Sequence, residues 1–387
     1  MTQRMRLAVL SAAANYAVHL QDSGGPLKST FLSTALAMVF CVCFIAPLPG
    51  HTTQPGDNPT APTETRNVII DTDPGTDDAM AILLALNSPE LNVKAITVVP
   101  GNAPGKQVLE NGLRLVSLAN RCDIPVAAGA LEPLFQKLIT NDAVHGKNGL
   151  GDIELPPSKC HVDPRFGPDL IIEMAHQMPH EITLIAIGPL TNLALALQKD
   201  PSVSSLIKEV IIMGGSINGG NSTAAAEANI FGDPEAAQIV FQAGWKVTMC
   251  TLGIGAKTVF TRERLATFSR THGPENDFAV EVINRIIGYG EKQGWGGMRM
   301  YDPTAVAAAL DSTLVETEFW HVDVETQGAY TRGETVANRI NAVERRAWRG
   351  DRFVFEGFDP VQPNVHVAVN IDADRFLNLF VARVSGK

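Results

Sequence analysis

The sequence lacks several signatures that would point to particular classes of protein. Five cysteines occur among 387 residues, and none forms a CxxC pair, so neither a zinc site nor a disulfide framework is indicated. We therefore expect buried free thiols at Cys122, Cys160 and Cys250. No long basic run is present and the net charge is −10, which argues against nucleic acid as a partner. There is also no internal repeat.

An apolar run of full bilayer length is missing as well. The run from Phe31 to Ala46 has about 16 residues, whereas a membrane-spanning helix needs roughly 20. Lys28 precedes this run, and a Pro- and Thr-rich stretch follows it up to Thr65. This order predicts the core of an export signal and a flexible linker, and hence a periplasmic or secreted protein. Because no clean A-x-A cleavage site follows, an uncleaved membrane anchor is the alternative. Residues 1–65 are thus set apart from a domain over 66–387.

The rest of the chain alternates between strand-like and helix-like runs. The hydrophobic content of 45% is sufficient for a sizeable core. Strands are predicted at 68–70, 92–99, 124–127, 182–187, 209–213 and 245–250, and helices at 79–86, 106–120, 168–178, 190–198 and 233–243. The alternation predicts an α/β, Rossmann-like fold with a mostly parallel central sheet and helices on both faces. A mainly helical region, 261–310, and a C-terminal extension with a strand at 365–369 and a helix near 374–381 complete it.

The most informative segment is residues 71–78, Asp-Thr-Asp-Pro-Gly-Thr-Asp-Asp. Its four carboxylates come directly after the strand at 68–70 and lead into the helix at 79–86. They therefore lie at the carboxyl end of a strand, where open α/β sheets bind their ligands. Like charges at such spacing repel each other unless a cation joins them. Oxygen ligands favour Ca²⁺ or Mg²⁺ over zinc.

Three other interpretations of this segment are open. Asp77 or Asp78 would be favoured as helix-capping acids, but capping does not require four carboxylates. An EF-hand loop would need Glu where Ile82 stands. A phosphatase of the haloacid dehalogenase type carries Asp-x-Asp after a strand, with the first Asp as the nucleophile, and Asp71 and Asp73 have this spacing.

Further polar landmarks follow the later strands, and together they resemble one known family. The motifs that follow residues 71–78 are Gly101-Asn102, Val144-His145-Gly146, Gly188-Pro189-Leu190-Thr191-Asn192, Met213-Gly214-Gly215, Glu227-Ala228-Asn229, Asp233-Pro234-Glu235 and Asp302-Pro303. In this order the series resembles the inosine-uridine-preferring nucleoside hydrolases from about Asn67 to Val336. The phosphatase interpretation explains none of the later motifs.

The resemblance implies an N-glycosidase that hydrolyses ribonucleosides to ribose and free base. It also implies a bound Ca²⁺, held by Asp73, Asp78, Asp302 and the backbone carbonyl of Ile187. These hard oxygen donors agree with the chemistry expected of the acidic segment. The implied catalytic step is attack by a metal-bound water that Asp73 activates as general base. The reaction builds positive charge on the sugar, which a nearby carboxylate stabilises.

By the same resemblance, a second set of residues grips the substrate. The residues that match substrate contacts are Asp77, Asn102, His145, Met213, Asn221, Glu227 and Asn229. For several of these a purely structural role is the alternative: a turn at Asn102, a loop at Asn221, a surface charge at Glu227 and a structural histidine at His145.

Two positions depart from the common family pattern. Many members carry His where this chain has Tyr301, and that His is thought to protonate the leaving base. Tyrosine is a weaker acid near neutrality but still donates a hydrogen bond. Trp295 lies six residues upstream and would activate a purine by stacking, unless it packs in the core. Ala228 replaces a frequent Phe, which leaves the base preference open.

The partners expected from the sequence are a small-molecule nucleoside and, by family resemblance, further copies of the chain in a dimer or tetramer. A non-catalytic exported binder of nucleoside or ribose is the alternative from a different functional class. The metal-binding acids argue against it, because they are the residues that a chain without turnover would lose first.

Overall fold

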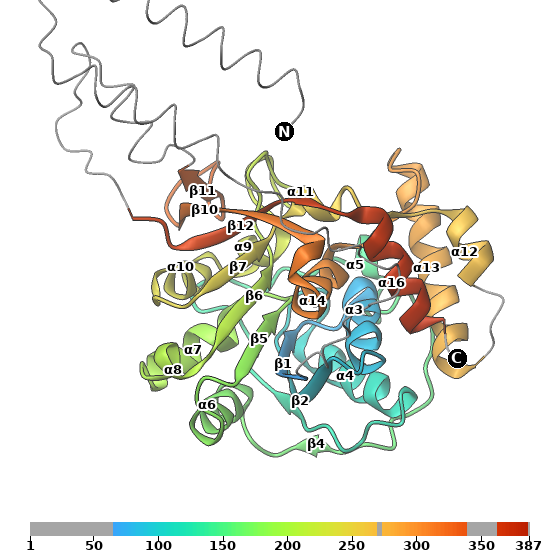
Figure 1. The fold of residues 1–387 in the computed structure, drawn as a ribbon, viewed down its shortest axis with the longest axis horizontal. Helices are drawn as coiled ribbons and strands as arrows, with labels where there is room; N and C mark the ends of the chain where they lie inside the picture. The colour runs from blue at the N-terminus through green and yellow to red at the C-terminus, as the bar shows by residue number, and fades with distance from the viewer. Residues whose placement is uncertain (1–64, 269–272, 339–361, 386–387) are drawn as a thin grey trace, which may run out of the picture. The chain divides into compact units, whose positions relative to one another are not determined.

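The centre of the described chain is a twisted sheet (Figure 1). Its first strand in the sequence lies inside the sheet, and later strands are added on both sides of it. The computed structural model describes residues 65–268, 273–338 and 362–385. The predicted export segment and linker therefore lie outside the described residues, apart from Thr65. Within the described ranges, no helix is long and apolar enough to cross a membrane.

The sheet is mostly parallel. Its strands, in spatial order, are β11 (Thr335–Asn338), β10 (Val315–Val324), β12 (Val365–Ile371), β7 (Val247–Cys250), β6 (Glu209–Met213), β5 (Ile182–Ala186), β1 (Arg66–Thr72), β2 (Leu91–Val98), β3 (Val126–Ala128) and β4 (Val162–Asp163). β10 runs antiparallel to both of its neighbours, and the other pairings are parallel. The chain builds β2 to β4 on one side of β1 and β5 to β7 on the other. The carboxyl ends of β1 and β5 therefore flank the crevice where such sheets bind ligands.

Helices cover both faces of the sheet. One face carries α3 (Thr76–Leu86), α4 (Gly105–Leu118), α13 (Pro274–Lys292), α14 (Tyr301–Leu310) and α16 (Ala373–Val384), and the other carries α6 (Gly167–Gln177), α7 (Thr191–Lys199), α8 (Val203–Leu206) and α10 (Pro234–Gln242). Strand alternation divides the core, because Val68 and Ile70 of β1 face the first group while Ile69 faces the second.

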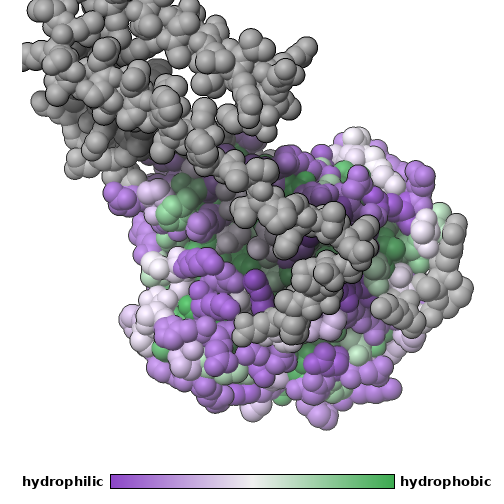
Figure 2. Space-filling model, in the orientation of Figure 1, coloured by the Kyte–Doolittle hydropathy of each residue, from purple (hydrophilic) through white to green (hydrophobic). Residues whose placement is uncertain are grey.

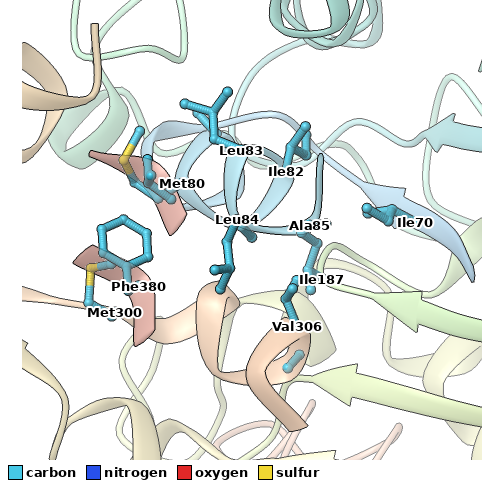
Figure 3. Packing of buried hydrophobic residues seen from close by; sticks show 14 of the residues in the cluster. Ile70, Met80, Ile82, Leu83, Leu84, Ala85, Ile187, Met300, Val306 and Phe380 are labelled. Carbon is cyan, nitrogen blue, oxygen red and sulfur yellow. The ribbon is translucent and has the colours of Figure 1, made fainter. Parts of the chain in front are cut away.

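The packing of α3 on α14 is central to the site. α3 is apolar on nearly every side, as expected of a helix enclosed in the core. Figure 3 draws Leu84 and Ala85 on the side of α3 that faces α14, which carries Val306. The buried stretch of α14 is rich in alanine, and small side chains let two helices approach closely. Both helices begin with acids, so this packing also brings their acidic N-terminal ends together.

Short elements complete the structure around the site. They are α5 (Asp142–His145), α9 (Ala228–Gly232), α11 (Leu252–Gly255), α12 (Arg262–Phe268), the 3-10 turn η1 (Ser312–Leu314) and a small antiparallel pair, β8 (Val259–Phe260) with β9 (Met298–Arg299). The predicted α/β architecture, the helical region and the C-terminal strands and helix are confirmed. β4, β8 and β9 were not predicted, because strands of two residues leave no periodicity to read.

The expectation of free thiols is wrong for two of the three cysteines. Cys122 and Cys160 form a disulfide across 38 residues of sequence, whereas Cys250 is free and buried. Spacing along the chain did not indicate this pair, because the fold brings the loop before β4 back to the end of α4. Ser158 Oγ donates to the carbonyl of Leu113 at 2.8 Å in the same place. The cross-link and this hydrogen bond fasten one loop to α4.

The described surface is largely hydrophilic on the face drawn. Figure 2 shows a face on which hydrophilic residues predominate and hydrophobic residues occur as scattered groups. Scattered apolar side chains are normal on the surface of a folded protein.

Candidate functional site

A cavity of about 500 Å³ opens beyond the carboxyl ends of β1, β5 and β6. Most of the residues singled out from the sequence line it. They are Asp77, Asn102, His145, Ile187, Met213, Asn221, Glu227, Asn229, Trp295, Tyr301 and Asp302. Residues from widely separated parts of the chain therefore meet at the switch point of the sheet, as the order of the strands requires.

The other two predicted residues, Asp73 and Asp78, are buried next to the cavity rather than in its lining. Asn102 connects both to it. Its backbone N–H donates to Asp73 Oδ2 at 2.7 Å, and its Nδ2 donates to Asp78 Oδ2 at 2.8 Å. Thr72 Oγ1 also donates to Asp78, at 2.6 Å. The remaining oxygen of Asp73, Oδ1, is buried and has no hydrogen-bond partner among the described residues.

The carboxylates form a dense acidic cluster. One oxygen from each of Asp77, Asp78 and Asp302 lies within 4.8 Å of the others. Burial raises the pKa of Asp302 well above its usual value, and repulsion from Asp77, Asp78 and Asp73 adds to the effect. The pKa of Asp73 is raised well above its usual value by burial and by Asp78. A hard divalent cation fits this donor set, because it would compensate the charge and satisfy the unpaired oxygen of Asp73.

Two glycines make room for Asp73. A Cβ atom at Gly101 would lie 2.1 Å from Asp73 Oδ2, and one at Gly188 would lie 2.6 Å from Asp73 Oδ1. The Asp73 carboxylate is therefore held between two backbone segments that approach it closely because they carry no side chain. Gly75 does the same for Asn102 and His145, since its Cβ would lie 2.5 Å from Asn102 Nδ2. These glycines explain the Gly-Asn and Gly-Pro motifs physically.

Glu227 and Asn229 brace the strand ends. Glu227 is the N-cap of α9 and accepts hydrogen bonds from the backbone N–H groups of Gly215 and Asn229 at 2.9 and 3.0 Å. Asn229 Nδ2 donates to the carbonyls of Ile187 and Met213, at 3.1 and 3.0 Å. Both side chains thus have structural partners and also line the cavity. Their predicted contacts with ribose stay predictions.

His145 is a neutral side chain in this site. Its burial lowers its pKa to about 4. The backbone N–H of Thr76 donates to Nδ1 at 3.2 Å, so the proton of the neutral ring lies on Nε2. His145 therefore offers the cavity a hydrogen-bond donor without a positive charge.

The cavity lining also includes aromatic residues and a cation that sequence reasoning missed. Tyr289 and Trp295 meet edge to face, with ring centroids 5.6 Å apart. The Arg299 guanidinium lies 4.5 Å from the centroid of the Trp295 ring, and its Nη1 donates to the Tyr301 hydroxyl at 3.3 Å. Trp295 thus lines the cavity rather than only packing in the core. The available signal for Arg299 was its place three residues before Asp302.

Comparison with known proteins supports the resemblance. The model of the inosine-uridine preferring nucleoside hydrolases matches residues 68–378. The chain belongs to this family. The match extends past Val336, the end expected from the motifs, because β12 and part of α16 belong to the same domain. The interpretations as a phosphatase and as a non-catalytic binder are therefore rejected, and the chain is an enzyme, a nucleoside hydrolase.

Several individual nucleoside hydrolases are similar over nearly their whole length. The pyrimidine-specific ribonucleoside hydrolase RihA of Salmonella arizonae is 39% identical over 325 residues, covering 82% of this chain and 97% of the relative. A plant nucleoside hydrolase, PpNRh1, superposes with a TM-score of 0.75 at 35% identity, covering 83% of this chain and 99% of that one. A purine-preferring ribonucleoside hydrolase from Gardnerella vaginalis gives 0.74 at 31% identity, with 83% and 98% covered.

The position of Asp71 in this nucleoside hydrolase also argues against the phosphatase. Its Oδ1 accepts hydrogen bonds from Thr97 Oγ1 at 2.5 Å and Asn192 Nδ2 at 2.8 Å. Asp71 is fully buried and does not line the cavity, so it cannot reach a phosphate ester there. It instead joins β1 to β2 and to the start of α7.

The first prediction concerns the space around Asp73. Gly188→Ala should lower kcat by about 10²-fold or more, because the added methyl group displaces the Asp73 carboxylate and a shift of about 1 Å has such an effect. Steady-state kinetics would measure it, with circular dichroism to confirm folding. The control is Gly288→Ala in α13, where no atom lies within 4 Å of the new Cβ. Equal activity of the two folded variants would contradict this account of Asp73.

The second prediction concerns pH. Burial raises the pKa of Asp71 to about 7 and that of Asp77 to about 6 from 3.8, so the folded state binds these protons more tightly than the unfolded state. After chelation, stability should therefore fall as pH rises from about 4 to about 7. The lowered pKa of His145 makes stability rise with pH over the same interval. This single group is outweighed by the several buried carboxyls. Thermal melts would test this, and Ca²⁺ should weaken the dependence. A chelated protein that gains stability across this interval would contradict the cluster as described.

Proposed function

We propose that this nucleoside hydrolase depends on Ca²⁺ and uses Asp73 as the general base toward the attacking water. The observation that supports it most directly is the Asp73 carboxylate itself. It is buried between Gly101 and Gly188, and its Oδ1 has no partner among the described residues. The unpaired oxygen gives the carboxylate an acceptor for the proton of a water molecule.

Ca²⁺ would be held by Asp73, Asp78, Asp302 and the carbonyl of Ile187. When bound, it supplies positive charge that offsets these acids and polarises water. The Ile187 carbonyl accepts Asn229 Nδ2, but a carbonyl oxygen has a second lone pair for a further partner. Asp77 belongs to the group of acids whose oxygens come closest together, so it borders the same position from the side of the cavity.

The protein side chains orient the sugar. Asp77 and Asn102 line the cavity beside the acids and suit the 2′ side of the ribose, while Asn229 suits its 3′-hydroxyl. Asn221, Met213 and Glu227 lie around the ribose face and the 5′ end. As the glycosidic bond lengthens, the sugar becomes positive, and the buried carboxylates favour that charge. Asp73 takes the proton of the water that bonds to the anomeric carbon.

The names of the relatives point in two directions on the base. The RihA relative is named pyrimidine-specific, whereas one of the superposed enzymes is named purine-preferring. Hydrogen bonds from His145 and Tyr301 and stacking on Trp295 would suit either kind of base, so a panel of nucleosides must decide.

The third prediction tests the base and the metal together. Asp73→Asn should lower kcat by about 10²–10⁴-fold, as for the loss of a general base. Residues 66–387 would be assayed for released ribose on uridine, cytidine, inosine and adenosine. Chelation should abolish hydrolysis and Ca²⁺ should restore it. The control is Asp123→Asn, which removes an exposed acid paired with Arg121. Full turnover by the chelated enzyme, or by Asp73→Asn, would reject this mechanism.

We also propose that the protein is exported. The apolar run at 31–46 and its Pro/Thr linker motivate this, and the Cys122–Cys160 disulfide supports it, because disulfides persist in oxidising compartments. The fourth prediction is that native protein begins between about Ala46 and Arg66 and has no free thiol at Cys122 or Cys160. N-terminal sequencing and thiol labelling before and after reduction would measure both. A cytoplasmic protein with an intact Met1 and two free thiols would contradict export.

A further inference from the structure

Arg299 contributes a positive charge to the lining of the cavity. It stands on β9 and lines the cavity with Trp295 and Tyr301, while the acids of the same cavity lie at the N-terminal ends of α3, α9 and α14. The side chain is partly buried, and its Nε is buried without a hydrogen-bond partner among the described residues. The Nη groups keep donors beyond the one given to Tyr301, so a ligand in the cavity can accept hydrogen bonds from them.

Two contacts hold the Arg299 side chain. The guanidinium stacks on Trp295, and its Nη1 donates to the Tyr301 hydroxyl. The Tyr301 ring in turn packs against Gly255, where an added Cβ would lie 2.3 Å from Cδ1. Because the Tyr301 oxygen accepts from Arg299, its own O–H remains free to donate elsewhere. A cation held in this way needs little reorganisation when charge develops beside it.

The cavity lining carries charges of both signs, because Asp77, Glu227 and Asp302 line it together with Arg299. Cleavage of an N-glycosidic bond develops positive charge on the sugar and negative charge on the base. With the sugar at the acids, the base faces Arg299, Trp295 and Tyr301. A guanidinium stays charged in folded proteins and donates through a planar fork, so it can stabilise an anionic base without giving up a proton.

We propose that Arg299 contacts the leaving base and stabilises it as an anion. This inference rests on the proposed nucleoside hydrolysis. The C1′–N bond breaks with its electron pair on the base nitrogen, and the water oxygen bonds to C1′ while Asp73 takes the water proton. Arg299 keeps all its protons and donates hydrogen bonds to the departing base. The base takes up a proton from solvent as it leaves.

The experiment compares substrates whose leaving groups differ in how much stabilisation they require as anions. Arg299→Gln keeps a donor for Tyr301 but removes the charge. On uridine and inosine its kcat should fall by about 10²–10³-fold, the range for a lost donor to a developing anion. On 4-nitrophenyl riboside, whose leaving group is already a stable anion, it should fall by less than about tenfold. Arg299→Lys, which keeps the charge and loses the fork, should be intermediate on the nucleosides.

Tyr301→Phe separates contact with the base from mere positioning of Tyr301. If Arg299 acted only by orienting that hydroxyl, Tyr301→Phe would cost as much as Arg299→Gln, and the double variant would cost no more than either. This result would overturn the proposal. Further loss in the double variant on nucleosides supports it.

Controls distinguish the remaining outcomes. Arg262→Gln removes an arginine paired with Glu291 outside the cavity and should leave both substrates unaffected. Equal losses of Arg299→Gln on both substrate types, or no loss on either, would overturn the role of Arg299 and leave the hydrolase intact. Activity of Arg299→Gln on the nitrophenyl riboside shows that the variant folds. A wild-type enzyme inactive on every riboside would overturn the proposed function and this inference with it.

Discussion

The site depends on the close packing of two buried helices, α3 and α14. Each begins with carboxylates, and their contact places Asp302 beside Asp77 and Asp78. Helix N-termini favour negative charge, but only in part. The core thus holds several acids closer than unscreened repulsion permits, at the cost of raised pKa values. Proton uptake by the acids relieves this repulsion in the metal-free protein, and a bound cation would remove it.

The surrounding backbone is shaped to serve these acids. Gly101 and Gly188 approach Asp73 from two neighbouring loops, and Asn102 links Asp73 to Asp78. Asn229 joins the ends of β5 and β6. These hydrogen bonds and close approaches tie Asp73, Asp78, Asn102 and Asn229 to the ends of the central strands. The lining also combines carboxylates with the Arg299 guanidinium, so the cavity holds groups of both charges.

Much of this arrangement follows from the sequence, and the exceptions have physical reasons. The strand–acid–helix order of residues 68–86 is local, so periodicity and charge spacing predicted it. The position of Asp302 beside Asp78 is not local, and only the family resemblance indicated it. Nothing in the spacing of Cys122 and Cys160 revealed their contact, because that pair forms only when the loop before β4 returns to α4. Arg299 escaped notice because a single arginine in a Gly-rich stretch has no pattern of its own.

The disulfide has a consequence for the cavity. His145 and Asn141 lie between Cys122 and Cys160 in the sequence, so this part of the lining belongs to a covalently closed ring. Closing a ring removes conformations that an open chain would explore. Less configurational entropy then remains to be lost when a substrate orders these residues, and the oxidation state of two distant sulfur atoms becomes a determinant of how well the pocket is preorganised.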